Sequence, residues 1–155
     1  MKELILKQMQ FEFWANWELL QTLKQANLLN ERALLLFSHI NSANLIWLNR
    51  LKEEVVSINL FQERTLTECE NLLLQNNTNW TGYLENITEA ELEKAITFNF
   101  PIDGTVRTMS KKDAIFHITN HSSYHRGQII SLIKGSVENL PMLGYIFFAS
   151  KISEQ

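Results

Sequence analysis

The sequence contains very little cysteine, proline or glycine. Its 155 residues include one cysteine, Cys69, two prolines and five glycines. A single cysteine excludes an intramolecular disulfide, which favours a cytoplasmic location. The neighbouring carboxylates of Glu68 and Glu70 are expected to raise the pKa of the Cys69 thiol and make it less reactive. Both prolines lie outside the strongest helical patterns, which fits an all-helical body.

Strong positive charge and long hydrophobic runs are also absent. The formal net charge is −3 and the pI is about 5.8, whereas nucleic-acid binding needs clustered Lys and Arg, so we expect no nucleic-acid partner. The longest apolar stretch, LGYIFFA at 143–149, is far shorter than the ~20 residues of a membrane span, so we expect no membrane partner. The length and the 45% hydrophobic content predict one domain over residues 1–155.

Four long segments have the apolar spacing of helices, with residues recurring every three or four positions. We expect these helices over about 3–25, from after Asn30 to about 56, from after Thr67 to about 86, and over about 111–134. The alternating segment at 95–109 contains a Pro-Ile-Asp-Gly turn and predicts a short β-like hairpin or a long loop. A short closing helix is expected over about 142–152. Together these elements predict an all-α four-helix bundle with a crossover connection.

The expected helix ends have residues that are typical of caps. Asn30 is a good N-cap for the second helix. Gly135 is expected to end the last long helix. Three pairs have the spacing of a capping box: Thr67 with Glu70, Thr88 with Glu91, and Ser110 with Asp113.

Three of the four histidines lie in one segment, HITNHSSYHRGQ. On a helix, with 100° per residue, four of its side chains fall within about 40° of His121. They share one narrow stripe: His117, His121, His125 and Gln128. Because the stripe continues through the apolar Leu132, it is expected to point into the bundle rather than into water.

Two imidazoles one helical turn apart can bind the same metal ion, although an H-x3-H pair by itself is also common as a structural feature. The remaining histidine, His39, lies among apolar residues of the second helix and is expected to face the core. His39, His121 and His125 are therefore the candidate metal ligands. Three neutral imidazoles would leave an open coordination position for water or a thiolate.

Other residues of the same segment have more than one possible role. His117 is about 12 Å along the helix axis from His125, so it is either a fourth ligand or a packing or hydrogen-bonding neighbour of the site. Gln128 either hydrogen-bonds a ligand histidine or simply packs. Arg126 is expected to pair with a carboxylate or to cap a neighbouring helix. A glycine inside a helix, such as Gly127, lowers helix stability by ~1 kcal/mol relative to Ala. We expect Gly127 to permit the close approach of another helix or loop.

Several segments together resemble the DinB/YfiT-like family, the damage-inducible DinB proteins. HITNHSSYHRGQII is similar to the signature helix of the family, and HINSANLIWLNRL to its second helix. FEFWANWELLQTL and NLPMLGYIFF are similar to its N-terminal and C-terminal segments. The resemblance implies an up-down-down-up four-helix bundle, usually a homodimer. It also implies a divalent metal, most often zinc or nickel, bound by His39, His121 and His125.

The resemblance also suggests a function. Relatives include thiol-dependent S-transferases and a mycothiol-dependent isomerase, in which the metal activates a low-molecular-weight thiol. We therefore expect a metal-dependent enzyme that activates such a thiol, or water, for attack on a small-molecule substrate that the sequence does not identify. The alternatives are a non-catalytic metal-binding stress-response protein and a bundle whose histidines bind no metal. One departure from the family is Gly144, which precedes Tyr145 where an acidic residue is frequent.

No catalytic carboxylate can be assigned from the sequence. A metal-bound thiolate needs no general base, whereas an attacking water usually does. The sequence therefore favours a transferase over a hydrolase.

Overall fold

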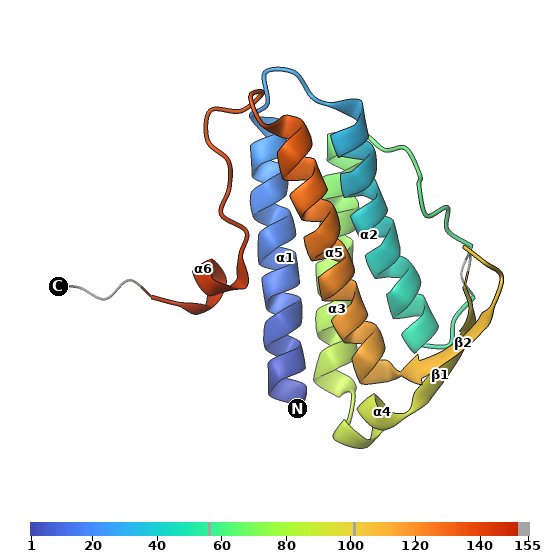
Figure 1. Ribbon diagram of the computed structural model, residues 1–155. Helices are drawn as coiled ribbons and strands as arrows, with labels where there is room; N and C mark the ends of the chain where they lie inside the picture. Colours follow the sequence, from blue (N-terminus) through green and yellow to red (C-terminus); the bar gives the residue numbers. More distant parts are fainter. Residues whose placement is uncertain (56, 101, 152–155) are drawn as a thin grey trace.

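The structure is a computed structural model that describes residues 1–55, 57–100 and 102–151. Four long helices form its body (Figure 1). They are α1 (Lys2–Lys24), α2 (Glu31–Leu51), α3 (Leu66–Asn86) and α5 (Lys111–Ile133). The smaller elements are α4 (Glu89–Glu93), β1 (Ala95–Asn99), β2 (Val106–Ser110) and α6 (Tyr145–Ala149).

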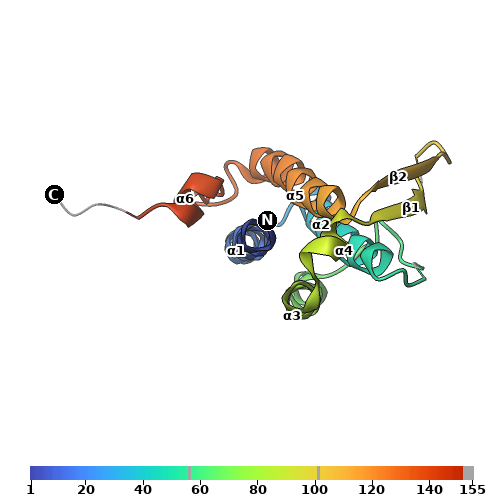
Figure 2. The ribbon, with the colours of Figure 1, turned by 90° about the horizontal axis from the view of Figure 1, so that it is seen from below.

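The four long helices run in the order up, down, down, up. In Figure 1, α1 rises from the N-terminus, α2 and α3 both descend, and α5 rises again. Each helix packs against two others: α1 and α2 both contact α3 and α5. Viewed along the bundle in Figure 2, the antiparallel β1–β2 hairpin lies beside α2, while α6 lies on the far side next to α1. The expected up-down-down-up bundle with a hairpin before the last long helix is confirmed.

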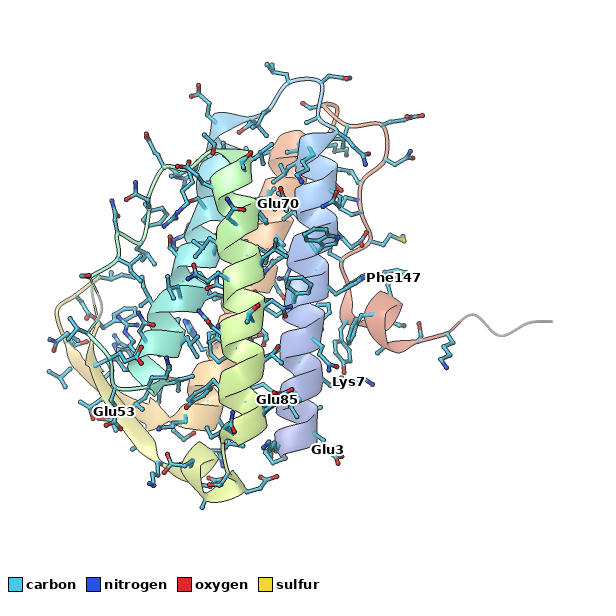
Figure 3. All side chains as sticks on the ribbon, turned by 180° about the vertical axis from the view of Figure 1, so that it is seen from behind. Glu3, Lys7, Glu53, Glu70, Glu85 and Phe147 are labelled. Carbon is cyan, nitrogen blue, oxygen red and sulfur yellow. The ribbon has the colours of Figure 1, made fainter. Side chains whose placement is uncertain are left out.

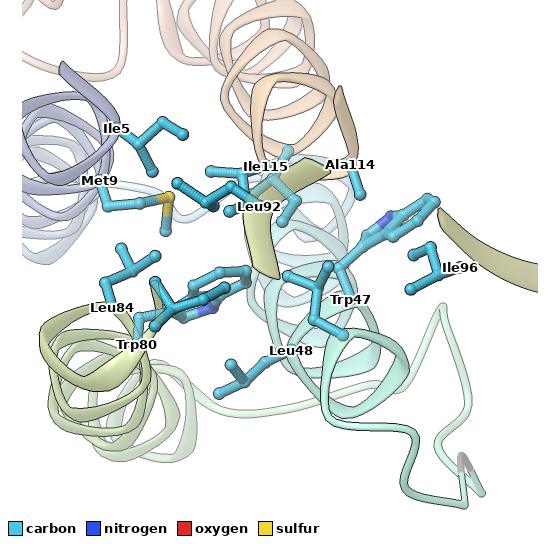
Figure 4. Packing of buried hydrophobic residues seen from close by; sticks show 13 residues of the cluster. Ile5, Met9, Trp47, Leu48, Trp80, Leu84, Leu92, Ile96, Ala114 and Ile115 are labelled. Atoms are coloured by element: carbon cyan, nitrogen blue, oxygen red, sulfur yellow. The ribbon is translucent and has the colours of Figure 1, made fainter. Parts of the chain in front are cut away.

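Two clusters of buried apolar side chains fill the bundle. One lies at the hairpin end: Trp80 of α3 lies beside Met9 of α1, and Trp47 of α2 lies beside Ile96 of the hairpin (Figure 4). The other includes Phe37 and surrounds the turn between α1 and α2. No helix in the described part of the chain has both the length and the apolar character needed to cross a membrane.

Between the two apolar clusters, all four long helices contribute buried polar side chains. In each helix these residues lie after the residues of one cluster and before those of the other. We call them the polar layer: Glu12, Asn16, Asn41, Asn44, Asn76, Ser122 and Arg126. Buried polar groups need hydrogen-bonding partners, so this layer requires the helices to meet in one register.

Most of the expected helix ends are confirmed, and two of them are wrong. Asn30 accepts a hydrogen bond from the Ala33 N–H, and Ser110 and Thr88 cap α5 and α4. Gly135 follows α5 with φ at +96°, the left-handed conformation in which glycine commonly ends a helix. The closing helix is α6, which is shorter than the expected 142–152. Residue 152 of that expected helix, and residue 101 of the expected hairpin turn, lie outside the described residues.

α2 ends at Leu51, about five residues before the expected end, and residue 56 itself lies outside the described residues. The chain turns at Glu53, which has φ at +60°. This conformation normally selects glycine or asparagine, so the sequence contains no residue that indicates the end of the helix.

α3 is capped by Thr65 and not by Thr67. The Thr65 hydroxyl accepts from the Glu68 N–H, and the Glu68 carboxylate accepts from the Thr65 N–H. Both threonines have a glutamate three residues later, so the spacing of the capping box does not distinguish between them.

Candidate metal centre

Three histidines from two helices converge on one point of the bundle. His39 comes from α2, and His121 and His125 come from successive turns of α5, which packs against α2. The ring centroids are 4.9 Å apart for His39 and His121, 4.6 Å for His39 and His125, and 4.5 Å for His121 and His125. One ring nitrogen of each residue lies within 4.8 Å of those of the other two. The structure thus brings together the three candidate ligands.

The spacing of the nitrogens fits a small divalent ion. Zinc–nitrogen bonds of about 2.1 Å place two ligands of a tetrahedral site about 3.4 Å apart and never more than about 4.2 Å apart. The Nε2 atoms of His39 and His121 are 3.0 Å apart. Because all three nitrogens lie within 4.8 Å, the widest pair must close by at most about 1.4 Å to reach the tetrahedral spacing.

Hydrogen bonds fix which nitrogen of two rings is free to bind a metal. Nδ1 of His39 lies 3.1 Å from the carbonyl oxygen of Leu60, and Nδ1 of His125 lies 2.7 Å from Oε1 of Gln128. Both oxygens accept, so each Nδ1 donates its proton and each Nε2 keeps its lone pair. Gln128 thus hydrogen-bonds a ligand histidine, which is one of the two roles that the sequence allows for it. Such bonds orient ligand histidines and raise their basicity.

The surroundings of the site favour the neutral form of His39 and His121. Burial, followed by the charges of His125, His39 and His117, lowers the pKa of His121 to about 3. Burial also lowers the pKa of His39, against the opposing effect of its hydrogen bond to Leu60. The neutral ring is the form that binds metal. His39 is 3% exposed, whereas His121 and His125 are half-buried, so the cluster lies at the edge of the core with one side toward solvent.

His117 lies beside this cluster and not within it. Its ring is 5.7 Å from that of His121 and 5.0 Å from that of Trp47. Burial lowers its pKa first, and the charge of Arg50 lowers it further. Of the two roles that the sequence allows for His117, its position against Trp47 fits the packing neighbour better than the fourth ligand.

Two aromatic residues beside the site were not expected from the sequence. Phe61, in the loop between α2 and α3, stacks on His39 with centroids 4.2 Å apart and planes inclined by 10°. Tyr124, on α5, lies edge-on to His125 at 5.2 Å. Both are exposed, at 45% and 66%. Because Phe61 lies in a loop, helical periodicity could not predict its contact with His39.

Arg126 follows His125 on α5 and points into the polar layer. Its Nη1 donates to Oε2 of Glu12 at 2.7 Å and to Oδ1 of Asn16 at 2.8 Å, and its Nη2 donates to Oγ of Ser123 at 2.8 Å. The expected pairing of Arg126 with a carboxylate is confirmed, although the partner was not identified from the sequence. In the sequence, Glu12 could have been recognised as a buried carboxylate because it lies among apolar residues of the first helix.

Two expectations for α5 are wrong. A Cβ added at Gly127 would meet nothing within 4 Å, so among the described residues no helix or loop packs closely against this position. Leu132 is 37% exposed, so the histidine stripe does not continue inward. The reason is angular: the core residues Ile118, Ile129 and Ile133 lie about 60–120° around the helix from His121, so the histidines occupy the edge of the buried face.

The fold and the site together define the class of this protein: an up-down-down-up helical bundle with a candidate three-histidine metal centre between its second and last long helices. The sequence matches the DinB family over residues 3–147, and the chain belongs to that family. No curated protein matched the sequence.

Proposed function

We propose that the protein binds a divalent metal ion, zinc or nickel, through His39, His121 and His125, and uses it to activate a low-molecular-weight thiol. A bound divalent ion lowers the pKa of a thiol or water that coordinates it. The observation that supports the proposal is the convergence of three imidazoles, two of them with Nδ1 engaged and Nε2 free.

The residues of this chain would orient and shield the reacting group. Leu60 and Gln128 hold the rings of His39 and His125 by hydrogen bonds. Phe61 covers one face of His39, and Tyr124 flanks His125. The exposed surfaces of these two aromatic rings are the positions where an apolar part of a substrate would pack.

A thiol is favoured over water by the composition of the cluster. The candidate metal group within the described residues consists of histidines alone. Water attack usually needs a general base, whereas a thiolate is a nucleophile without one. The expected reaction is therefore attack of the thiolate sulfur on an electrophilic carbon, an S-transferase-like activity: an S–C bond forms, a leaving group such as halide departs with its bonding electrons, and the thiol proton goes to solvent.

Metal content is the first test. We expect protein purified without a histidine tag to contain close to one equivalent of metal, by mass spectrometry of the metals. His39→Ala and His125→Ala should lose it, while His117→Ala, two turns before His125 on α5, should retain it. Full occupancy in both His39→Ala and His125→Ala would contradict the assignment, and loss in His117→Ala would make His117 a ligand.

Activity is the second test. Conjugation of several thiols to a generic aryl halide, measured with and without a chelator, should show metal-dependent turnover in the wild type that His125→Ala lacks. Metal binding without turnover for any thiol would instead support the alternative, a non-catalytic metal-binding stress-response protein. The homodimer implied by the family resemblance stays a prediction, and light scattering of the purified protein would test it.

A further inference from the structure

A cavity lies on another side of the bundle from the histidines. It has a volume of about 200 Å³ between α1, α2 and α3, and its lining includes no residue of α5. Met9, Trp80 and Leu84 form its apolar wall and face one another from α1 and α3 (Figure 4). The mouth lies between α1 and α3, where Glu85 is labelled in Figure 3.

Part of the polar layer forms the inner side of this cavity, and two residues of that part have an unused hydrogen-bond acceptor. Asn41 and Asn76 are 1% and 4% exposed, both line the cavity, and Oδ1 of each has no hydrogen-bond partner. The orientation of both amides is fixed by their other ends. Nδ2 of Asn41 donates to the Phe37 carbonyl, and Nδ2 of Asn76 donates to the Asn41 carbonyl. Since a carbonyl can only accept, neither amide can be flipped to turn its unused oxygen into a donor.

The charge of the lining points to the same kind of ligand. Its charged residues are two carboxylates, Glu12 and Glu85, and it contains no lysine or arginine. Arg126 neutralises Glu12 from the far side, which leaves the exposed Glu85 at the mouth. Unused acceptors and negative charge favour a group that donates hydrogen bonds and carries positive charge, and a protonated amine offers three donors.

We propose that this cavity binds a small organic amine. Each of the two oxygens has less than 1 Å² of accessible surface, so a small shift of the asparagine side chains accompanies binding. The ammonium group then donates to the unused oxygens of Asn41 and Asn76, and the apolar chain packs against Met9, Trp80 and Leu84. The two asparagines are adjacent, because Nδ2 of Asn76 donates to the Asn41 backbone carbonyl at 2.9 Å. This site does not depend on the metal centre.

Hexylamine is a suitable probe, and hexanoate of the same chain length is the matched anion. Titration of the metal-free protein should shift the side-chain amide signals of Asn41 and Asn76 and the indole signal of Trp80 in ¹H–¹⁵N spectra. We expect saturable binding of hexylamine with a Kd on the order of 0.1–1 mM, since a ligand of about seven non-hydrogen atoms rarely binds more tightly. Hexanoate should bind at least about tenfold more weakly, which corresponds to 1.4 kcal/mol.

Variants on α3 separate the proposed site from general effects. Asn76→Leu removes one acceptor and should weaken hexylamine binding by about tenfold, whereas Asn79→Leu, an exposed position outside the lining, should not. Thr81→Trp, at an exposed lining position, should block access without altering the buried polar groups, and it serves as the test if Asn76→Leu does not fold.

A cavity that holds only water would give a different result, since its size is sufficient for several molecules. The absence of saturable shifts with hexylamine, or equal affinity for hexylamine and hexanoate, would overturn the proposal. Because the titration uses metal-free protein and reads no activity, its outcome is separate from that of the metal and thiol experiments.

Discussion

Replacing Glu12 by alanine should remove a large part of the folding free energy. The carboxylate is 2% exposed and accepts from three side chains: Oε1 from Asn16 and Asn44, at 2.8 and 3.2 Å, and Oε2 from Arg126 at 2.7 Å. Its removal leaves the guanidinium of Arg126, itself 2% exposed, without a counter-charge. Breaking a buried ion pair from one side costs about 3–5 kcal/mol, out of the roughly 5–15 kcal/mol that stabilise a domain of this kind.

Urea unfolding followed by circular dichroism measures this loss. With an m-value of about 2 kcal/mol/M, a loss of 4 kcal/mol moves the midpoint down by about 2 M. Glu70→Ala is the matched control, because Glu70 pairs with Lys24 at the surface and such pairs contribute about 0–1 kcal/mol. The double variant Glu12→Leu/Arg126→Met should regain part of the loss, since an apolar pair of similar volume needs no counter-charge, while the buried Asn16 amide loses both of its partners. A Glu12→Ala loss no larger than that of Glu70→Ala would refute the reasoning.

Three further predictions concern α5. Gln128→Leu should weaken metal binding by about 10–100-fold, because it removes the acceptor that orients His125; an unchanged Kd in a competition with a chelating dye would contradict this. Without metal, the free energy of unfolding should fall as the pH falls from about 6.5 toward 5, because the unfolded chain then binds protons that His121, with its pKa lowered to about 3, does not bind in the folded state. The dependence is at most about 1.4 kcal/mol per pH unit for each such group, and His121→Gln should make it shallower; an identical pH dependence in this variant would argue against it. Gly127→Ala should raise the unfolding free energy by about 0.5–1 kcal/mol, because the position is helical and a Cβ there meets nothing within 4 Å; a lower urea midpoint would show a contact that the structure does not have.

The histidine cluster could be predicted from the sequence because helical spacing alone places His121 and His125 on one stripe. His39 required more, because periodicity does not say which faces of two separate helices meet. His39 was chosen because it is the remaining histidine and lies among apolar residues of its helix, and the family resemblance implied the same three ligands. The expectation that the histidine stripe points into the core was wrong. The stripe lies to one side of the buried isoleucines of α5, and this angle can be judged only when the buried face of the helix is known.

The polar layer was not predicted, although its residues are present in the sequence. Glu12 and Asn76 interrupt helices that are otherwise amphipathic, and a single polar residue on an apolar face does not reveal its partner. Arg126 and Glu12 are 114 residues apart in sequence, so only the packing of α1 against α5 shows the pair. The same limit applies to Phe61 and Leu60, since a loop has no periodicity from which its contact with His39 could be inferred.

The polar layer lies at the same height in the bundle as the metal centre, and this position suggests what it does. Apolar side chains tolerate small shifts of one helix along another, whereas the hydrogen bonds of Glu12 with Arg126, Asn16 and Asn44 do not. Because Arg126 adjoins His125 on α5, a shift that breaks this network also moves His125 relative to His39. We therefore expect Glu12→Leu/Arg126→Met to bind metal more weakly than the wild type even where its urea midpoint is partly recovered. Equal metal affinity in the two proteins would show that apolar packing alone aligns α2 and α5.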